Sequence, residues 1–166
     1  VKNSANVDVV GNESAFTGDD GIDVENSANA DVQGNTIFAA RNNGIEVENS
    51  KKPDVSDNIV TNVGDNGIYV EGSNSTRILR NSIESVGDNG ISVANSDKIK
   101  IRRNVIKDVS ENGIIVDGGN DAIIKKNRIR RSGENGIVAQ NTTDALITEN
   151  LVRKSDAAGV LVDGAF

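Results

Sequence analysis

Residues 64–93 read GDNGIYVEGSNSTRILRNSIESVGDNGISV, and this stretch contains the phrase GDNGIxV twice, 23 residues apart. The same interval runs through the whole chain. Glycine recurs at Gly21, Gly44, Gly67, Gly90, Gly113, Gly136 and Gly159. Asparagine recurs at Asn12, Asn35, Asn58, Asn81, Asn104, Asn127 and Asn150. Because no insertion or deletion interrupts either series, the sequence predicts about seven copies of one structural unit.

Apolar residues form three further columns in these copies. One column follows the repeat glycine, as in Ile68 and Val70, a second contains Ile78, and a third contains Ile83. The apolar positions alternate with other residues and most are β-branched, which is typical of short half-buried strands. Three strands per unit, separated by corners rich in Gly, Asn and Ser, predict a triangular coil. Stacked coils predict three short parallel sheets.

The pattern NGIxVxNS…IxxNxI…G resembles the right-handed parallel β-helix repeat of the pectate-lyase-like superfamily, over essentially the whole chain. The resemblance implies an all-β solenoid of about seven coils of 23 residues, as a single domain over residues 1–166. It also implies polysaccharides as common partners, and we expect an extracellular or cell-envelope location. Val1 aligns with the end of a strand and no capping segment flanks the repeats, so we expect a module excised from, or part of, a longer chain.

The two polar repeat columns have structural explanations. Asn precedes the repeat glycine in five copies, and Asn-Gly predicts a turn with positive φ at the glycine. The other asparagine column predicts an asparagine ladder in a bend, where each side chain bonds to its own backbone and to the Asn above it.

The composition excludes several classes of chemistry. The chain contains no His, Cys, Met or Trp, one Tyr and three Phe. A disulfide framework, a Ser-His-Asp triad and a His-ligated metal site are therefore excluded. No apolar run is long enough for a transmembrane helix, so we expect no membrane insertion. The net charge of −7 and the scarcity of stacking aromatics argue against nucleic acid as a partner.

Charge is uneven along the predicted rod. Residues 1–75 carry 4 basic and 13 acidic side chains, whereas residues 76–166 carry 14 basic and 12 acidic ones. Opposite charges at the two ends predict end-to-end self-association as one mode of assembly.

The alternation of side chains places a cluster of carboxylates on one outer face. Like charges at one strand spacing raise one another's pKa or recruit a cation, and Ca²⁺ accepts such oxygen ligands. No cofactor is expected to be required, and Ca²⁺ is the candidate ion. Its candidate ligands are Asp23, Glu25, Glu46, Glu48 and Glu71. A solvated surface that keeps the protein soluble is the alternative interpretation of this face and of the basic face described next.

The basic side chains gather on another face. Lys107, Arg130 and Arg153 share one column and are the candidate anion-binding residues. Further basic residues lie nearby in the same coils: Arg102, Arg103, Lys125, Lys126, Arg128 and Arg131.

Three functions fit these observations. The first is a non-catalytic β-helix module, a scaffold or stalk that binds polysaccharide through Tyr69, Glu71, Glu48 and Asp23, with Phe38 as a second aromatic candidate. The second is a fragment of a polysaccharide-active enzyme, namely a polyuronate lyase, an epimerase or a glycoside hydrolase. The third is an engineered or idealised solenoid, which the uniform repeats favour.

The uniform repeat length argues against catalysis. Active enzymes of the resembled superfamily wall their groove with long loops, whereas all six intervals here are 23 residues. Asn29-Ala30-Asp31 and Asp19-Asp20 resemble two hydrolase motifs, but a chain without His cannot supply the Gly-His-Gly element of that set. We therefore expect no catalytic residue and favour the non-catalytic module.

Overall fold

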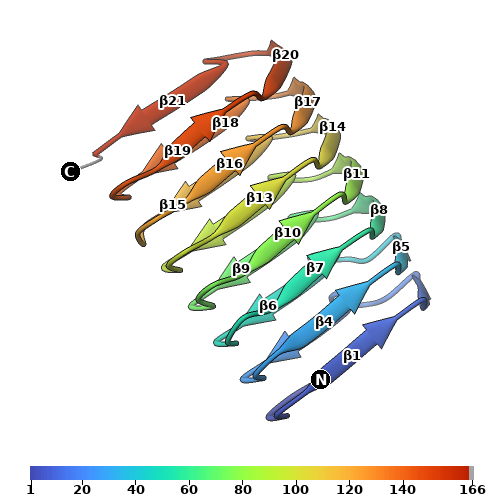
Figure 1. Ribbon diagram of the computed structural model, residues 1–166. Helices are drawn as coiled ribbons and strands as arrows, with labels where there is room; N and C mark the ends of the chain where they lie inside the picture. Colours follow the sequence, from blue (N-terminus) through green and yellow to red (C-terminus); the bar gives the residue numbers. More distant parts are fainter. Residues whose placement is uncertain (165–166) are drawn as a thin grey trace.

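The computed structural model describes residues 1–164 and shows a right-handed parallel β-helix (Figure 1). The chain winds through 21 strands, three in each coil, and the described residues form no helix. Successive coils stack along one axis, so the blue N-terminal coil and the red C-terminal coil lie at opposite ends of the rod. The predicted all-β solenoid with three parallel sheets is confirmed.

Each sheet contains seven strands, one from each coil. The β1 sheet consists of β1 (Val7–Val10), β4 (Ala30–Gln33), β7 (Asp54–Ser56), β10 (Arg77–Leu79), β13 (Lys100–Arg102), β16 (Ile123–Lys125) and β19 (Leu146–Thr148). The β2 sheet consists of β2 (Glu13–Ala15), β5 (Thr36–Phe38), β8 (Ile59–Val63), β11 (Ser82–Val86), β14 (Val105–Val109), β17 (Arg128–Ser132) and β20 (Leu151–Ser155). The β3 sheet consists of β3 (Ile22–Glu25), β6 (Ile45–Glu48), β9 (Ile68–Glu71), β12 (Ile91–Ala94), β15 (Ile114–Asp117), β18 (Ile137–Gln140) and β21 (Val160–Asp163).

Strands pair in register, each residue with the residue 23 positions later. Ile68 pairs with Ile91, and Ile78 pairs with Ile101. The apolar columns therefore stack inside the rod, where Ile68, Ile78 and Ile83 are fully buried. Burying a side chain of this size stabilises the fold by about 1.5–3 kcal/mol, and stacking repeats that gain in the interior coils. In the last coil, Val160 and Val162 are exposed.

The asparagine column lies at the corner between the β1 and β2 sheets. Asn81 donates its side-chain amide to the side-chain oxygen of Asn104 at 3.0 Å and to the backbone carbonyl of Val55 at 2.9 Å. The backbone N–H of Asn81 also donates to the Asn104 side-chain oxygen, at 2.9 Å. The same pattern joins Asn58 to Asn81 and Asn104 to Asn127. Each buried amide is thus satisfied by the preceding and the following coil, rather than by its own backbone as the sequence predicted.

The predicted positive φ at the repeat glycines is wrong. Positive φ occurs at six other glycines but not at Gly67 or its equivalents. The reason for glycine there is close approach between coils. A Cβ on Gly67 would lie 2.5 Å from Cγ2 of Ile83 and 2.6 Å from the carbonyl oxygen of Gly90. Only a residue without a side chain leaves room for the Ile83 column and the next coil.

The left-handed backbone occurs instead at sheet corners and within the longer strands of the β2 sheet, as at Ser85 in β11. One such column follows the β3 sheet and includes Asn26, Asn49, Gly72 and Asn95. Asn and Gly tolerate this conformation best, so the Asn of the ENS sequence, rather than the Asn-Gly dipeptide, carries the turn signal. The serines that follow this column are buried, and the N–H of Ser50 donates to the hydroxyl of Ser73 at 2.9 Å.

Within residues 1–164, no helix has the length and hydropathy needed to cross a membrane.

Candidate functional site

The predicted acidic residues come together on the outer surface of the β3 sheet. Strand pairing places Asp23 beside Glu46 and Glu46 beside Tyr69. It also stacks Glu25, Glu48 and Glu71 in one file. All six side chains are half-buried because neighbouring coils cover their stems. We call this surface, formed by Asp23, Glu25, Glu46, Glu48, Tyr69 and Glu71, the acidic face.

Hydrogen bonds fix part of this face. The Tyr69 hydroxyl donates to a carboxylate oxygen of Glu71 at 2.7 Å. Burial raises the pKa of Tyr69, and the hydrogen bond to Glu71 raises it further, so the phenol stays protonated. At the other edge, Lys2 pairs with Glu25 at 2.6 Å and contacts Asp23 at 3.6 Å.

Glu46 has the most perturbed carboxyl group of the acidic face. Burial raises the pKa of Glu46 to about 8, and a hydrogen bond to Asp20 and the charges of Asp20 and Glu48 add to the shift. Asn43 contacts Glu46 at 3.4 Å. Burial, followed by the carboxylates of Glu25 and Glu71, raises the pKa of Glu48. The face therefore holds fewer negative charges at neutral pH than its composition indicates.

The geometry does not arrange these carboxylates as a ready-made cation site. The described part of the chain contains no group of three or more His, Cys, Asp or Glu side chains placed to hold a metal ion. Calcium binding by Asp23, Glu25, Glu46, Glu48 and Glu71 stays a prediction, and it requires these side chains to rearrange. Asp20 was not among the predicted site residues, because it lies at a corner and reaches Glu46 only through the stacking of coils.

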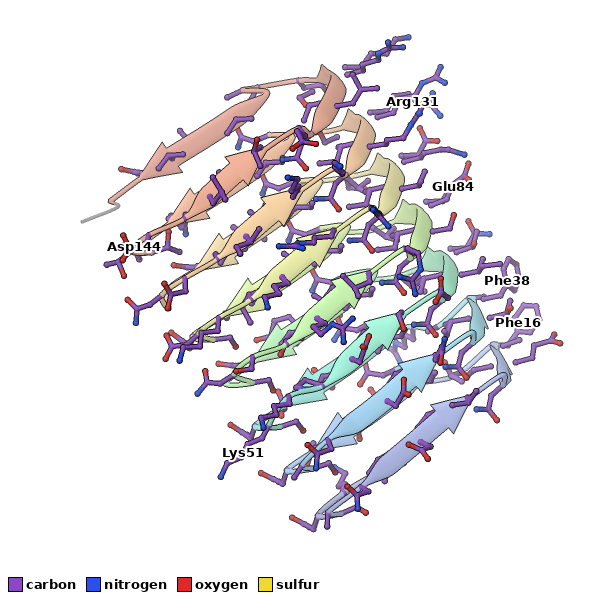
Figure 2. The ribbon with its side chains drawn as sticks, viewed as in Figure 1. Phe16, Phe38, Lys51, Glu84, Arg131 and Asp144 are labelled. Atoms are coloured by element: carbon purple, nitrogen blue, oxygen red, sulfur yellow. The ribbon has the colours of Figure 1, made fainter. Side chains whose placement is uncertain are left out.

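The second aromatic candidate lies elsewhere. Phe38 is at the end of β5 in the β2 sheet, so it does not share a surface with Tyr69. Figure 2 shows Phe38 projecting outward beside Phe16. Their ring centroids are 5.4 Å apart in an edge-to-face arrangement. Phe38 therefore packs against Phe16 rather than contributing to the acidic face.

The predicted anion-binding residues also lie in register. Lys107, Arg130 and Arg153 occupy neighbouring strands of the β2 sheet and line a groove of about 590 Å³. Lys107 also contacts Glu84 at 3.4 Å.

Of the basic residues that the sequence placed nearby, Arg128 lines this same groove and Arg131 lies on β17 beside Arg130, whereas the other four lie elsewhere. Arg102 and Lys125 belong to the β1 sheet, and Arg103 and Lys126 lie at the corner just after it. They line a separate groove of about 600 Å³ together with Arg77, Arg80 and Lys100, which the sequence did not single out. The change from Asp54 to Arg77 and Lys100 in one column was the signal that could have identified them.

Comparisons with known proteins agree with the fold. The family model described as "Periplasmic copper-binding protein (NosD)" matches residues 1–165. No curated protein matches the chain.

Solved structures match with low sequence identity. The A-module of the Azotobacter vinelandii mannuronan C-5 epimerase AlgE6 has a TM-score of 0.69 at 13% identity, over 98% of this chain and 58% of that one. The periplasmic alginate epimerase AlgG has a TM-score of 0.64 at 14% identity, over 96% and 39%. The Streptococcus pneumoniae surface protein and adhesin PfbA has a TM-score of 0.52 at 11% identity, over 98% and 68%. At these identities the similarity concerns the fold, and the chain spans less than two thirds of either epimerase structure.

Proposed function

We propose, from the premise that this chain belongs to the family described as periplasmic copper-binding protein (NosD), that it is a non-catalytic β-helix module of the cell envelope. In this proposal it is a rigid scaffold that binds polysaccharide on its acidic face. The periplasmic description of the family and of AlgG, and the surface location stated for PfbA, support an envelope location.

The family description names copper, but the side chains that usually bind copper in proteins are absent from this sequence. Copper sites in proteins use thiolate, thioether and imidazole ligands. The chain contains no Cys, Met or His. We therefore derive no function of this chain from copper.

The observation that carries the proposal is the hydrogen bond between Tyr69 and Glu71 on a flat sheet surface. It holds the phenol ring in place, and the ring lies beside carboxylates that can accept hydrogen bonds from sugar hydroxyls. An aromatic ring with a few fixed polar groups is a common way of binding an oriented ligand. Because the surrounding charge is negative, this face suits a neutral glycan better than an acidic one.

A scaffold role is supported by the regular coils. Loops that could wall a groove are missing from the described residues, since each strand follows the preceding one through a short corner. A reaction on the acidic face would take place in contact with bulk water, where electrostatic stabilisation of a transition state is weak.

A glycan array with the complete chain tests the binding proposal. We expect binding to a neutral polysaccharide that weakens at least about tenfold in Tyr69→Ala and less in Tyr69→Phe, which keeps the ring. Thr61→Ala, on the outer surface of β8, is the control and should leave binding unchanged. Absence of neutral-glycan binding, or equal loss in Thr61→Ala, would contradict the proposal.

A second candidate, a polyuronate lyase or epimerase, is favoured by Glu46. A carboxyl group with a raised pKa beside another carboxylate and a tyrosine is a typical general-acid environment. Incubation with polyuronates, followed by the absorbance of unsaturated ends and by proton NMR of the sugar residues, tests this candidate. Turnover that disappears in Glu46→Gln would replace the non-catalytic proposal.

Calcium binding is tested separately by isothermal titration. Heat at millimolar Ca²⁺ that is lost in Glu48→Gln would support the predicted ligands, and absence of heat would remove them.

A further inference from the structure

A basic groove lies on the outer surface of the β1 sheet, away from the acidic face. It has a volume of about 600 Å³, and seven of its eight lining residues are Lys or Arg. The remaining lining residue is Leu79. So many like charges in one groove repel one another unless anions balance them, and the protein itself balances only part of the groove.

The cations at the two ends of the groove are paired within the protein. Arg77 pairs with Asp54 at 3.2 Å, and Arg80 pairs with Asp57 at 2.6 Å. At the other end, Glu149 accepts both Lys125 at 2.6 Å and Lys126 at 3.2 Å.

The cations in the middle coil have no such partners. Lys100 and Arg102 lie on β13 and Arg103 at the corner after it, and none of them forms an ion pair within residues 1–164. The Nε atom of Arg102 is also buried without a hydrogen-bond acceptor. Lys100 and Arg103 are exposed and Arg102 is half-buried, so an anionic ligand in the groove can balance the charge of this coil.

We propose that this groove binds a linear anionic polysaccharide, whose acidic groups occupy the positions beside Lys100, Arg102 and Arg103. Cations recur on successive coils, as in the column of Arg80, Arg103 and Lys126. Neighbouring coils are separated by about 4.8 Å. A polymer that carries acidic groups at regular intervals and lies along the rod axis therefore meets one set of cations per coil. This site lies on a different sheet from the acidic face and does not depend on it.

Carboxylate or sulfate groups fit these side chains chemically. A guanidinium group binds such planar or tetrahedral anions through two parallel N–H donors. Single-stranded nucleic acid also carries regular negative charge, but its binding sites add aromatic side chains on which bases stack. No aromatic residue lines this groove.

Fluorescence anisotropy with the complete chain tests the site. The labelled probes are polygalacturonate oligosaccharides, dextran sulfate, uncharged dextran and a thymidine oligonucleotide. The test variant is Lys100→Gln/Arg102→Gln/Arg103→Gln. The control variant, Arg41→Gln/Lys51→Gln/Lys98→Gln, removes the same charge from exposed residues that line neither basic groove.

We expect polygalacturonate or dextran sulfate to bind the native chain, with an affinity that falls as salt rises. Any binding of uncharged dextran should be the same in the native chain and in the test variant. The test variant should weaken binding more than about thirtyfold and the control variant less than about threefold. Carboxylate and sulfate polymers are distinguished by which probe binds more tightly, and either supports the site. Equal losses in both variants, tighter binding of the oligonucleotide, or no binding would overturn the proposal.

Two further variants keep the test decisive. Circular dichroism checks that the triple variants fold. A separate variant, Arg102→Lys, keeps the positive charge but removes the two parallel N–H donors of the guanidinium group. We expect Arg102→Lys to weaken binding about fivefold or more. Tyr69→Ala should leave binding to the anionic polymer unchanged. The proposal for the acidic face and the proposal for this groove can therefore be contradicted independently of each other.

Discussion

The side-chain amide of Asn81 donates to the side-chain oxygen of Asn104 at 3.0 Å, one coil further along the chain, and both residues are buried. This contact repeats through the corner between the β1 and β2 sheets and couples each coil to the next. The first prediction follows from it.

Replacing Asn81 with Leu should lower the free energy of unfolding by about 3 kcal/mol, because the donors of Asn58 and the carbonyl of Val55 lose buried partners. Thermal denaturation by circular dichroism measures the change. Asn74→Leu, at an exposed corner, is the control and should cost less than about 1 kcal/mol. An unchanged melting temperature in Asn81→Leu would show that the column does not stabilise the fold.

Replacing Gly67 with Ala should destabilise the protein by at least about 2 kcal/mol. The added methyl group would overlap Ile83 and the carbonyl of Gly90. Gly159 occupies the same repeat position, but a Cβ there meets no atom within 4 Å. Gly159→Ala should therefore change stability by less than about 0.5 kcal/mol. Urea denaturation measures the free energy of unfolding of both variants. Equal changes in Gly67→Ala and Gly159→Ala would show that backbone flexibility, rather than close packing, explains the repeat glycine.

Replacing Gly119 with Ser restores the residue that most copies have at this position, yet it should be unfavourable by about 2 kcal/mol. Gly119 has a φ of 89°, and a Cβ there would lie 2.2 Å from the carbonyl oxygen of Ser96. Gly118→Asn is the comparison, because Asn95 already adopts positive φ at the equivalent position. A higher melting temperature in Gly119→Ser would contradict this prediction. It would show that the serine found in most copies stabilises the coil by more than the positive φ and the close contact destabilise it.

Glu46 should make stability fall as pH rises. Its pKa is about 8 in the folded protein, above the ordinary value of 4.5. The folded state therefore holds a proton that the unfolded state has lost, and unfolding becomes easier as pH rises from about 4.5 to about 8. Glu46→Gln should flatten this decline in melting temperature, whereas Glu84→Gln on β11 should leave it unchanged. A decline of the same size in Glu46→Gln would contradict the assignment.

The sequence predicted the fold because the information for a solenoid is local and repeated. The column of Ile68 and its equivalents alternates with polar residues and recurs every 23 positions, so one coil predicts all the others. The acidic face followed from the same alternation, since strand pairing preserves which side chains point outward. The sequence could not show why the repeat glycines are needed. Glycine is required at position 67 because its backbone lies close to Ile83, which belongs to another sheet.

The sequence by itself determined that the chain forms stacked coils with Ile and Val inside, because residue type and spacing decide which positions are buried. Only the tertiary structure decided how the outward charges pair. Asp20 reaches Glu46 across a corner, and Arg77 and Lys125 find acidic partners on neighbouring coils while Lys100, Arg102 and Arg103 do not. The 23-residue period aligns equivalent residues of neighbouring coils. It does not specify which charged side chains come close enough to form an ion pair, because that depends on distances between side chains in the folded structure.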